Sequence, residues 1–145
     1  MKYSFSNDPA LSQKLFDLLD TVFPGVRQVA QNARALAASW ESISTPFIHF
    51  EDDRAVSHVG VIELPLVLLG RTVRVGSIHG VATHPDYRRR GHFGRLIEEA
   101  IEYCAGRYET LILTTEHPEY FEPFGFRVVQ EHLFTTGGKS SDGDG

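Results

Sequence analysis

The sequence predicts neither an internal disulfide nor a membrane-spanning segment. The chain of 145 residues contains a single cysteine, Cys104, which cannot form an internal disulfide and favours a reducing compartment. Its most apolar run, VGVIELPLVLLG, is interrupted by Glu63 and Pro65 and is too short to cross a bilayer. The N-terminus MKYSFSNDPA lacks the apolar core of a signal peptide. We therefore expect a cytoplasmic protein that does not bind a membrane.

Positive charge is scarce as well. Lys and Arg number 14 against 19 Asp and Glu, which gives a formal net charge of −5 at pH 7 and argues against nucleic-acid binding. The exception is local, in the run YRRRGHFGRL, which contains Arg88, Arg89, Arg90 and Arg95. Such a cluster in an acidic protein suits a small anionic ligand better than a polyanion.

Hydrophobic spacing predicts helices in the first part of the chain. Asp8 and Pro9 are typical of a helix start, and Phe23-Pro24-Gly25 ends the segment. Between them, apolar residues repeat at helical spacing: Leu11, Leu15, Leu18, Leu19 and Val22. A second helix is expected to place on one face the residues Val29, Ala30, Ala33, Leu36, Ala37 and Trp40.

From Pro46 the apolar period changes to two, which predicts strands. We expect them at 47–50, 55–69 and 72–83, with a tight turn at Gly70-Arg71 and a bulge or an edge at Pro65. A third helix begins near Gly91 and buries a stripe that ends at Cys104, which we interpret as a core residue. Further expected elements are a short strand at 1–5, a buried strand at 111–115, a turn or short helix at 118–123 and closing strands at 126–135.

This order of elements predicts an α/β fold with one mixed sheet. The length and the ordinary composition, with 41% apolar and 23% charged residues, indicate one globular domain, which we place at 1–136. The tail GGKSSDGDG at 137–145 has no apolar residue and is expected to be disordered or to serve as a linker.

The arginine run has a structural and a functional interpretation. A helix N-terminus presents unpaired backbone N–H groups and the positive end of the helix dipole, so it favours an anion. Gly91 and Gly94 would let a phosphate approach those N–H groups. The alternative is a tight strand-to-helix turn whose arginines are simply solvated. The Gly-Lys-Ser/Thr of a P-loop and the spacing of the dinucleotide fingerprint are both missing from the sequence.

Two ordered motifs resemble those of a known superfamily. The run HPDYRRRGHFGRLI is similar to the acyl-CoA site of the GNAT N-acyltransferases, whose signature is Arg/Gln-x-x-Gly-x-Gly/Ala. Arg88, Gly91 and Phe93 occupy its three positions, and Gly94 follows one place late. Downstream, EYFEPFGFR resembles the aromatic-x-x-x-Gly-Phe segment of the same superfamily. The resemblance covers roughly residues 44–130 and is strongest to the predicted acetyltransferase branch.

The resemblance implies a central, mostly antiparallel sheet with a β-α-β acyl-CoA-binding core flanked by helices. Acetyl-CoA is then the cosubstrate, and the loop binds its pyrophosphate. The strand before the loop, 77–83, splays from its neighbour to admit the pantetheine, and a backbone N–H there stabilises the oxyanion. The residues expected to bind the cofactor are Val81, Ala82, Thr83, Arg88, Arg89, Arg90, Gly91, His92, Phe93 and Gly94.

Amine attack on a thioester needs a neutral nucleophile, so the reaction calls for a proton acceptor. His79 is the candidate, because a histidine pKa of about 6.5 suits a base near neutral pH and alternation puts it on one face with Val81 and Ser77. The alternative is a hydrogen-bonded or half-exposed strand histidine. His84 and His117 are weaker candidates in loops.

A proton donor for the departing thiolate is less evident. The tyrosine that many members of the superfamily use corresponds to Phe121 here, so its neighbour Tyr120 is the candidate acid, or else a packed aromatic. None of the seven histidines belongs to a cluster with convincing metal-ligand spacing, so no metal site is expected.

We therefore predict an N-acetyltransferase that acts on a primary amine. The acceptor is a small-molecule amine or a lysine-like group, with a preference for cations because the protein is acidic. The alternative is a non-catalytic acyl-CoA-binding or regulatory module, which would bind acetyl-CoA without releasing thiol. The sequence leaves a homodimer open.

Overall fold

The computed structural model describes residues 1–5, 8–35 and 39–129. It divides into two compact units, Met1–Thr114 and a second unit that begins at Thr115. The single domain at 1–136 stays a prediction, and the tail at 137–145 lies outside the described residues.

Helix α1 (Pro9–Val22) begins as the sequence predicts. The Asp8 carboxylate accepts hydrogen bonds from the backbone N–H groups of Ala10 and Leu11, at 3.1 and 3.3 Å, and Pro9 occupies the first turn. The helix ends at Phe23, whose N–H still bonds the carbonyl of Leu19. The residues that α1 buries are Leu11, Leu15, Phe16, Leu18 and Leu19.

The second predicted helix is wrong in its extent. Helix α2 covers Val26–Ala35, and Trp40 belongs to a separate short helix, α3 (Trp40–Ile43), because the Ser39 hydroxyl caps a new start by accepting the N–H of Ser42. Val29, expected on the buried face, is 66% exposed. The expected face also included Leu36 and Ala37, which lie outside the described residues.

The described residues form a four-stranded mixed sheet in the order β1-β2-β3-β4. Strands β1 (Ser44–Glu51), β2 (Arg54–Leu68) and β3 (Arg71–Thr83) are antiparallel. Strand β4 (Thr110–Ile112) pairs parallel with β3 and is reached through helix α4 (His92–Cys104). The predicted fold class, with its β-α-β unit, is confirmed.

Several details of the strands differ from the prediction. The β2–β3 turn lies at Leu69-Gly70, both in the left-handed region with φ of 52° and 76°. Pro65 lies at an edge, since the pairing of β1 with β2 stops at Ser44↔Ile62. The strand expected at 1–5 is a single bridge from Lys2 to Phe47. The strand expected to be buried at 111–115 is shorter and mostly exposed, because β4 is the last strand of the sheet that the described residues form.

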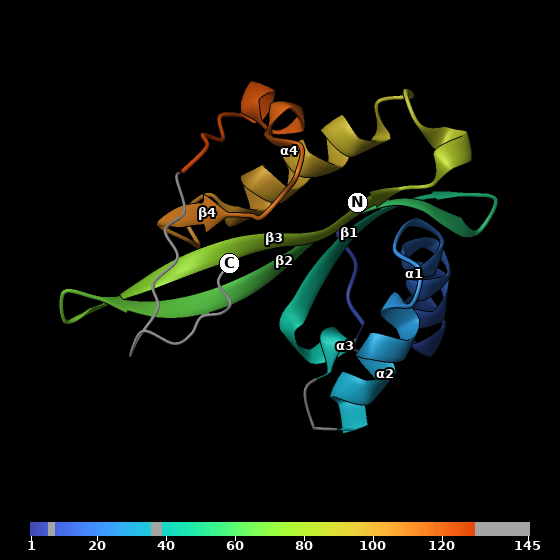
Figure 1. Ribbon diagram of the computed structural model, residues 1–145, viewed down its shortest axis with the longest axis horizontal. Coiled ribbons are helices and arrows are strands. Elements are labelled where there is room, and N and C mark those ends of the chain that lie inside the picture. The colour runs from blue at the N-terminus through green and yellow to red at the C-terminus, as the bar shows by residue number, and fades with distance from the viewer. Residues whose placement is uncertain (6–7, 36–38, 130–145) are drawn as a thin grey trace, which may run out of the picture. The chain divides into compact units, whose positions relative to one another are not determined.

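The sheet carries helices on both faces (Figure 1). Helix α1 lies on one face, where its apolar side chains pack with Ile48, Ala55 and Ala82 of the three long strands. Helix α4 lies on the other face and buries Leu96, Ile97, Ala100 and Cys104. Burying each leucine or isoleucine contributes about 1.5–3 kcal/mol, so both faces stabilise the sheet. Cys104 is a core residue as predicted, and burial raises the pKa of its thiol to about 11.

The described part of the second unit is short. It contains two turns of 3-10 helix, η2 (Pro118–Tyr120) and η3 (Glu122–Phe124), which confirm the turn predicted at 118–123. Residues 126–129 form no strand, and the rest of the strands expected at 126–135 lies outside the described residues. Within the described part of the chain, no helix is long and apolar enough to span a membrane.

Candidate functional site

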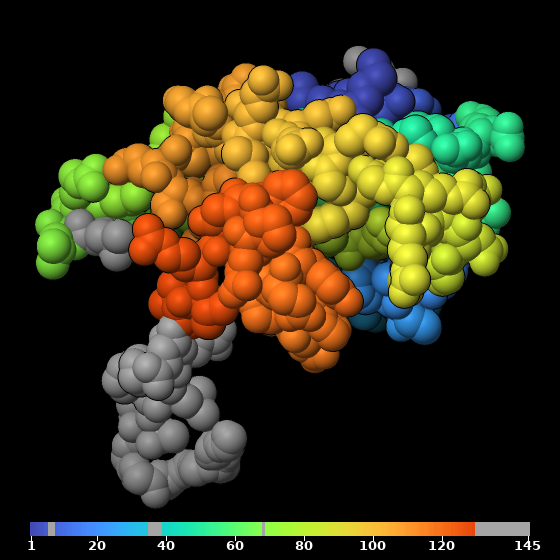
Figure 2. All heavy atoms as spheres, turned by 90° about the horizontal axis from the view of Figure 1, so that it is seen from above, coloured from blue at the N-terminus to red at the C-terminus, as the bar shows by residue number. Residues whose placement is uncertain are grey.

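The arginine loop joins β3 to α4 through a turn of 3-10 helix, η1 (Pro85–Tyr87). Two residues of the loop have left-handed backbone conformations, Arg89 with φ of 64° and Gly91 with φ of 81°. Gly91 is the N-cap of α4, and glycine suits it because a side chain is strained at that φ. The segment lies at the molecular surface, in yellow in Figure 2.

The arginine side chains hold the loop together while they stay exposed. Arg88 donates from Nε to the carbonyl of Thr83 at 3.1 Å, which ties the loop to the end of β3. Arg90 donates from Nη2 to the carbonyl of Asp86 at 3.3 Å, and its guanidinium lies 5.0 Å from the centre of the Tyr87 ring. Arg95 reaches back from α4 to the carbonyl of Arg90 at 3.4 Å. The loop is therefore a built turn with positive charge at its surface.

The N-terminus of α4 is suited to an anion. A helix does not use the N–H groups of its first turn internally, and here the N–H of Arg95 bonds the carbonyl of Gly91 at 3.1 Å. The first turn contains no acidic residue that would oppose an anion. Phe93 and Gly94 are half-buried in this turn. The side chain of His92 is only 6% exposed, so among its groups only the backbone can serve a ligand of the loop.

Strand β3 continues well beyond its pairing with β4. In the described residues that pairing covers Val75 to Ser77, whereas β3 runs on to Thr83. Ala82 is buried, and Val81 and Thr83 are half-buried. The far end of β3, next to the loop, thus has one edge on β2 and no recorded strand on the other, which is the kind of edge that an extended ligand can pair with.

A β-bulge interrupts β3 at this point. Gly60 pairs with His79 and His58 with Ala82, so two residues of β3, Gly80 and Val81, oppose the single residue between them on β2. Gly80 has φ of 59°. The prediction that His79 and Val81 share a face is therefore wrong, because the extra residue breaks the alternation and puts His79 on the face of Ala82.

His79 lies in a mostly apolar environment. Its Nε2 is 2.7 Å from the hydroxyl oxygen of Ser44, which is buried at the start of β1. Its ring centre is 4.6 Å from that of Trp40, which in turn packs edge-on against Phe16 of α1. Burial lowers the pKa of His79 to about 4, so the ring is neutral at physiological pH.

A second histidine, His58, is buried directly behind the bulge. Its Nδ1 donates to the carbonyl of Gly80 at 2.6 Å, since a carbonyl can only accept. Burial lowers its pKa to about 3. In the described residues, Nε2 of His58 and Nε1 of Trp40 are buried without a hydrogen-bond partner. The ring centres of His58 and Trp40 lie 6.3 and 4.6 Å from that of His79, so the two unpaired atoms favour a polar ligand or water near it.

Sequence reasoning missed Ser44, Trp40 and His58. Ser44 and His79 are brought together only by the register of three strands, which spacing along the chain does not reveal. The glycine inside the strand run HVGVI was a signal in the sequence, because glycine within a strand often marks a close approach of other atoms. In the structure, a Cβ at Gly60 would lie 2.6 Å from Nε2 of His79.

The other candidate residues have ordinary surroundings. Tyr120 belongs to the second unit, is 57% exposed and stacks on His117 with 5.1 Å between ring centres. Its neighbour Phe121 is buried. His84 is buried and accepts the N–H of Asp86, so it caps η1.

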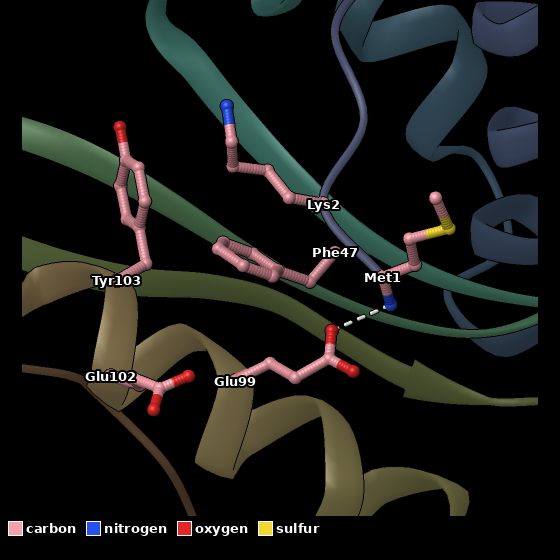
Figure 3. Close-up of a pocket in the computed structure, with 6 residues that line it drawn as sticks. All are labelled: Met1, Lys2, Phe47, Glu99, Glu102 and Tyr103. Carbon is pink, nitrogen blue, oxygen red and sulfur yellow. Dashed lines mark ion pairs between the residues drawn. The ribbon is translucent and has the colours of Figure 1, made fainter.

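A surface pocket of about 440 Å³ lies elsewhere on the first unit (Figure 3). It is lined by Met1, Lys2, Phe47, Glu99, Glu102 and Tyr103. The N-terminal ammonium pairs with Glu99 across it at 2.6 Å. Its lining contains none of the predicted site residues, so we do not assign the site to it.

Comparison with known proteins adds a family and a set of similar folds. A family model described as the acetyltransferase (GNAT) domain matches residues 8–129. No curated protein matches the chain.

Three solved structures illustrate the similarity of fold. An acetyltransferase from Trypanosoma brucei is 21% identical, with 93% of this chain and 97% of that one covered and a TM-score of 0.64. AAC(6')-Iy, in complex with the bisubstrate analog CoA-S-monomethyl-acetylneamine, is 15% identical, with coverage of 93% and 94% and a TM-score of 0.71. A predicted acetyltransferase with acetyl-CoA from Clostridium acetobutylicum is 14% identical, with coverage of 93% and 93% and a TM-score of 0.66.

Proposed function

Because this chain belongs to the GNAT acetyltransferase family, we propose that it transfers an acetyl group from acetyl-CoA to a primary amine. The observation that carries the proposal is the position of the arginine loop at the N-terminus of α4, tied by Arg88 to the end of β3, where only the edge toward β2 is paired among the described residues. Similar folds named with acetyl-CoA and with a coenzyme A bisubstrate analog support the choice of donor. A cytoplasmic location is proposed from the sequence composition alone.

In this proposal the loop from Arg88 to Gly94 binds the pyrophosphate of coenzyme A. The backbone of Gly91 and of the first turn of α4 provides the contacts, and Arg88, Arg89 and Arg90 add positive charge around them. The pantetheine pairs with the edge of β3 at Val81, Ala82 and Thr83. A backbone N–H of the bulge stabilises the oxyanion that forms when the amine attacks the thioester carbonyl.

The proton transfers involve two side chains. The amine nitrogen forms the new bond to carbon, the carbon–sulfur bond breaks, and the nitrogen loses a proton to His79 directly or through a water. His79 is competent to accept because its low pKa keeps it unprotonated, although a pKa of about 4 makes it a weak base. Tyr120 is the proposed donor to the thiolate, which can also take its proton from solvent.

Release of free thiol from acetyl-CoA in the presence of amines tests the proposal. The panel contains polyamines, aminoglycosides and lysine-like amines, with neutral amines of similar size as the matched comparison. We expect turnover with cationic amines, because the protein carries a net charge of −5. Binding of acetyl-CoA without thiol release from any amine would favour the acyl-CoA-binding module, and a protein that does not bind acetyl-CoA would contradict both functions.

A further inference from the structure

Three side chains with metal-binding groups meet where β1 passes the start of α4. His49 and Glu51 lie near the end of β1, and His92 is the first residue of α4. One ring nitrogen from each histidine and one carboxylate oxygen all lie within 4.8 Å of one another. Nε2 of His49 is 3.0 Å and Nε2 of His92 is 3.7 Å from Oε2 of Glu51.

His92 has a buried ring nitrogen that the contacts within the described residues do not satisfy. Its side chain is buried, yet its Nε2 has no hydrogen-bond partner among the described residues, since 3.7 Å to Glu51 is too long for one. A buried polar atom without a partner costs free energy unless something binds it. This nitrogen is directed toward the carboxylate of Glu51, so a ligand at that point would satisfy it.

The spacing suits a zinc-type ion. Zn²⁺ binds histidine nitrogen and carboxylate oxygen at about 2.0–2.2 Å, which in a tetrahedron separates neighbouring ligand atoms by about 3.4 Å. The two distances to Oε2 of Glu51, 3.0 and 3.7 Å, lie on either side of this value. The two imidazoles stack with their centres 4.0 Å apart and 20° between their planes. A histidine nitrogen binds a metal in the plane of its ring, so at least one of the two rings must rotate before both can bind the same ion.

We propose that His49, Glu51 and His92 bind a divalent transition-metal ion of the zinc class. Two imidazoles and one carboxylate are a ligand set that leaves the fourth position to water. His49 and Glu51 are half-buried, so the ion has access from solvent. The ion would link the end of β1 to the start of α4 through its ligands. The sequence predicted no metal site because the third ligand is distant along the chain from the His-x-Glu pair.

Arg95 competes with the ion for His92. Its Nη2 lies 2.9 Å from Nδ1 of His92, and arginine can only donate, so without metal the proton of the ring is on Nε2. Metal binding at Nε2 moves that proton to Nδ1, and Arg95 must then leave. Arg95 is exposed and is free to do so. Removing it should therefore strengthen metal binding.

The test uses the full chain without a histidine tag, stripped of metal with a chelator. Zn²⁺ is titrated by calorimetry, and Co²⁺ by visible absorption, which reports the coordination geometry. We expect one ion per chain in the parent and an affinity at least about tenfold weaker in His49→Ala and Glu51→Gln. His117→Ala is the matched control, because His117 and Glu119 form a pair at the same spacing, 3.2 Å apart, with no third ligand among the residues that the structure describes.

His92→Gln completes the set, with circular dichroism to verify folding because the residue is buried. Arg95→Ala should bind Zn²⁺ several-fold more tightly than Arg107→Ala, whose arginine packs on Tyr103 at the other end of α4. A parent protein that binds no Zn²⁺, or equal losses in His49→Ala and His117→Ala, would overturn the site. Equal affinity in the two arginine variants would overturn the competition for His92.

Discussion

Replacing Gly91 with alanine separates the proposed role of the arginine loop from its folding. Gly91 has φ of 81°, where an alanine costs about 1–2 kcal/mol of backbone strain. The added Cβ would lie 3.3 Å from Nη1 of Arg95, a flexible group that can move. Gly106, just past the other end of α4, has φ of 82° and no atom within 4 Å of an added Cβ. Gly106→Ala therefore carries the same strain, about 20 Å away along a helix of this length.

The two variants should differ in coenzyme A binding. A methyl group at Gly91 stands where a phosphate must approach the backbone of the helix N-terminus. Losing one hydrogen bond to a charged group costs roughly 1.5–3 kcal/mol, which weakens the affinity about tenfold to a hundredfold. Gly106→Ala should leave the affinity unchanged. Gly91→Val should weaken binding further, at the expense of more strain because valine is β-branched.

Calorimetry with coenzyme A and thermal melting decide the matter together. Both alanine variants should melt about 2–8 °C below the parent, and by similar amounts, since their backbone strain is the same. Only Gly91→Ala should lose affinity. Equal affinities in the two variants would refute the argument that the loop backbone binds the pyrophosphate, and so would a parent protein that does not bind coenzyme A.

The remaining predictions concern the protons. His79→Ala should lower turnover roughly a hundredfold without changing acetyl-CoA affinity. Because burial lowers the pKa of His79 to about 4, any inflection near pH 6.5 in the pH–rate profile of the parent should also be present in the variant. Loss of such an inflection in the variant would contradict the buried position of His79. Tyr120→Phe should lower turnover about tenfold or more if its hydroxyl protonates the thiolate, with Tyr108→Phe as the control, and equal rates would leave Tyr120 a packed aromatic. His58 has a folded-state pKa of about 3 against about 6.5 when unfolded, so the unfolded chain binds the proton first as the pH falls. This group alone should lower the free energy of unfolding by about 2 kcal/mol from pH 8 to pH 5, and His79, with a folded-state pKa of about 4, should add a similar amount; in urea melts the drop should be smaller in His58→Gln than in the parent.

Local signals in the sequence predicted much of the fold, and long-range contacts account for what they missed. Asp8 and Pro9 mark the start of α1, and the apolar stripe of α4 ends at Cys104, because caps and helical periodicity act within a few residues. The bulge at Gly80 was missed, since it depends on His58 of a neighbouring strand. The break between α2 and α3 was missed for a different reason: an alanine-rich run hid the cap at Ser39.

The candidate site divides in the same way. The turn from Arg88 to Gly91 and the helix that follows it were predictable, because glycine and helix ends carry their chemistry locally. The surroundings of His79 were not, since Ser44 and Trp40 reach it only through strand register and helix packing. The binding and catalytic roles of these residues stay predictions until the variants above are measured.

The bulge in β3 shifts the alternation of side chains along the strand by one residue. His79 and Ala82 already face the same way, as they would in a regular strand with one residue fewer between them. A chain that lacked Gly80 would keep both side chains on their present face and would lose the Gly80 carbonyl that accepts the hydrogen bond of His58. A one-residue deletion, rather than any substitution, is therefore the change that would remove this carbonyl acceptor and keep the facing of the side chains in the sheet.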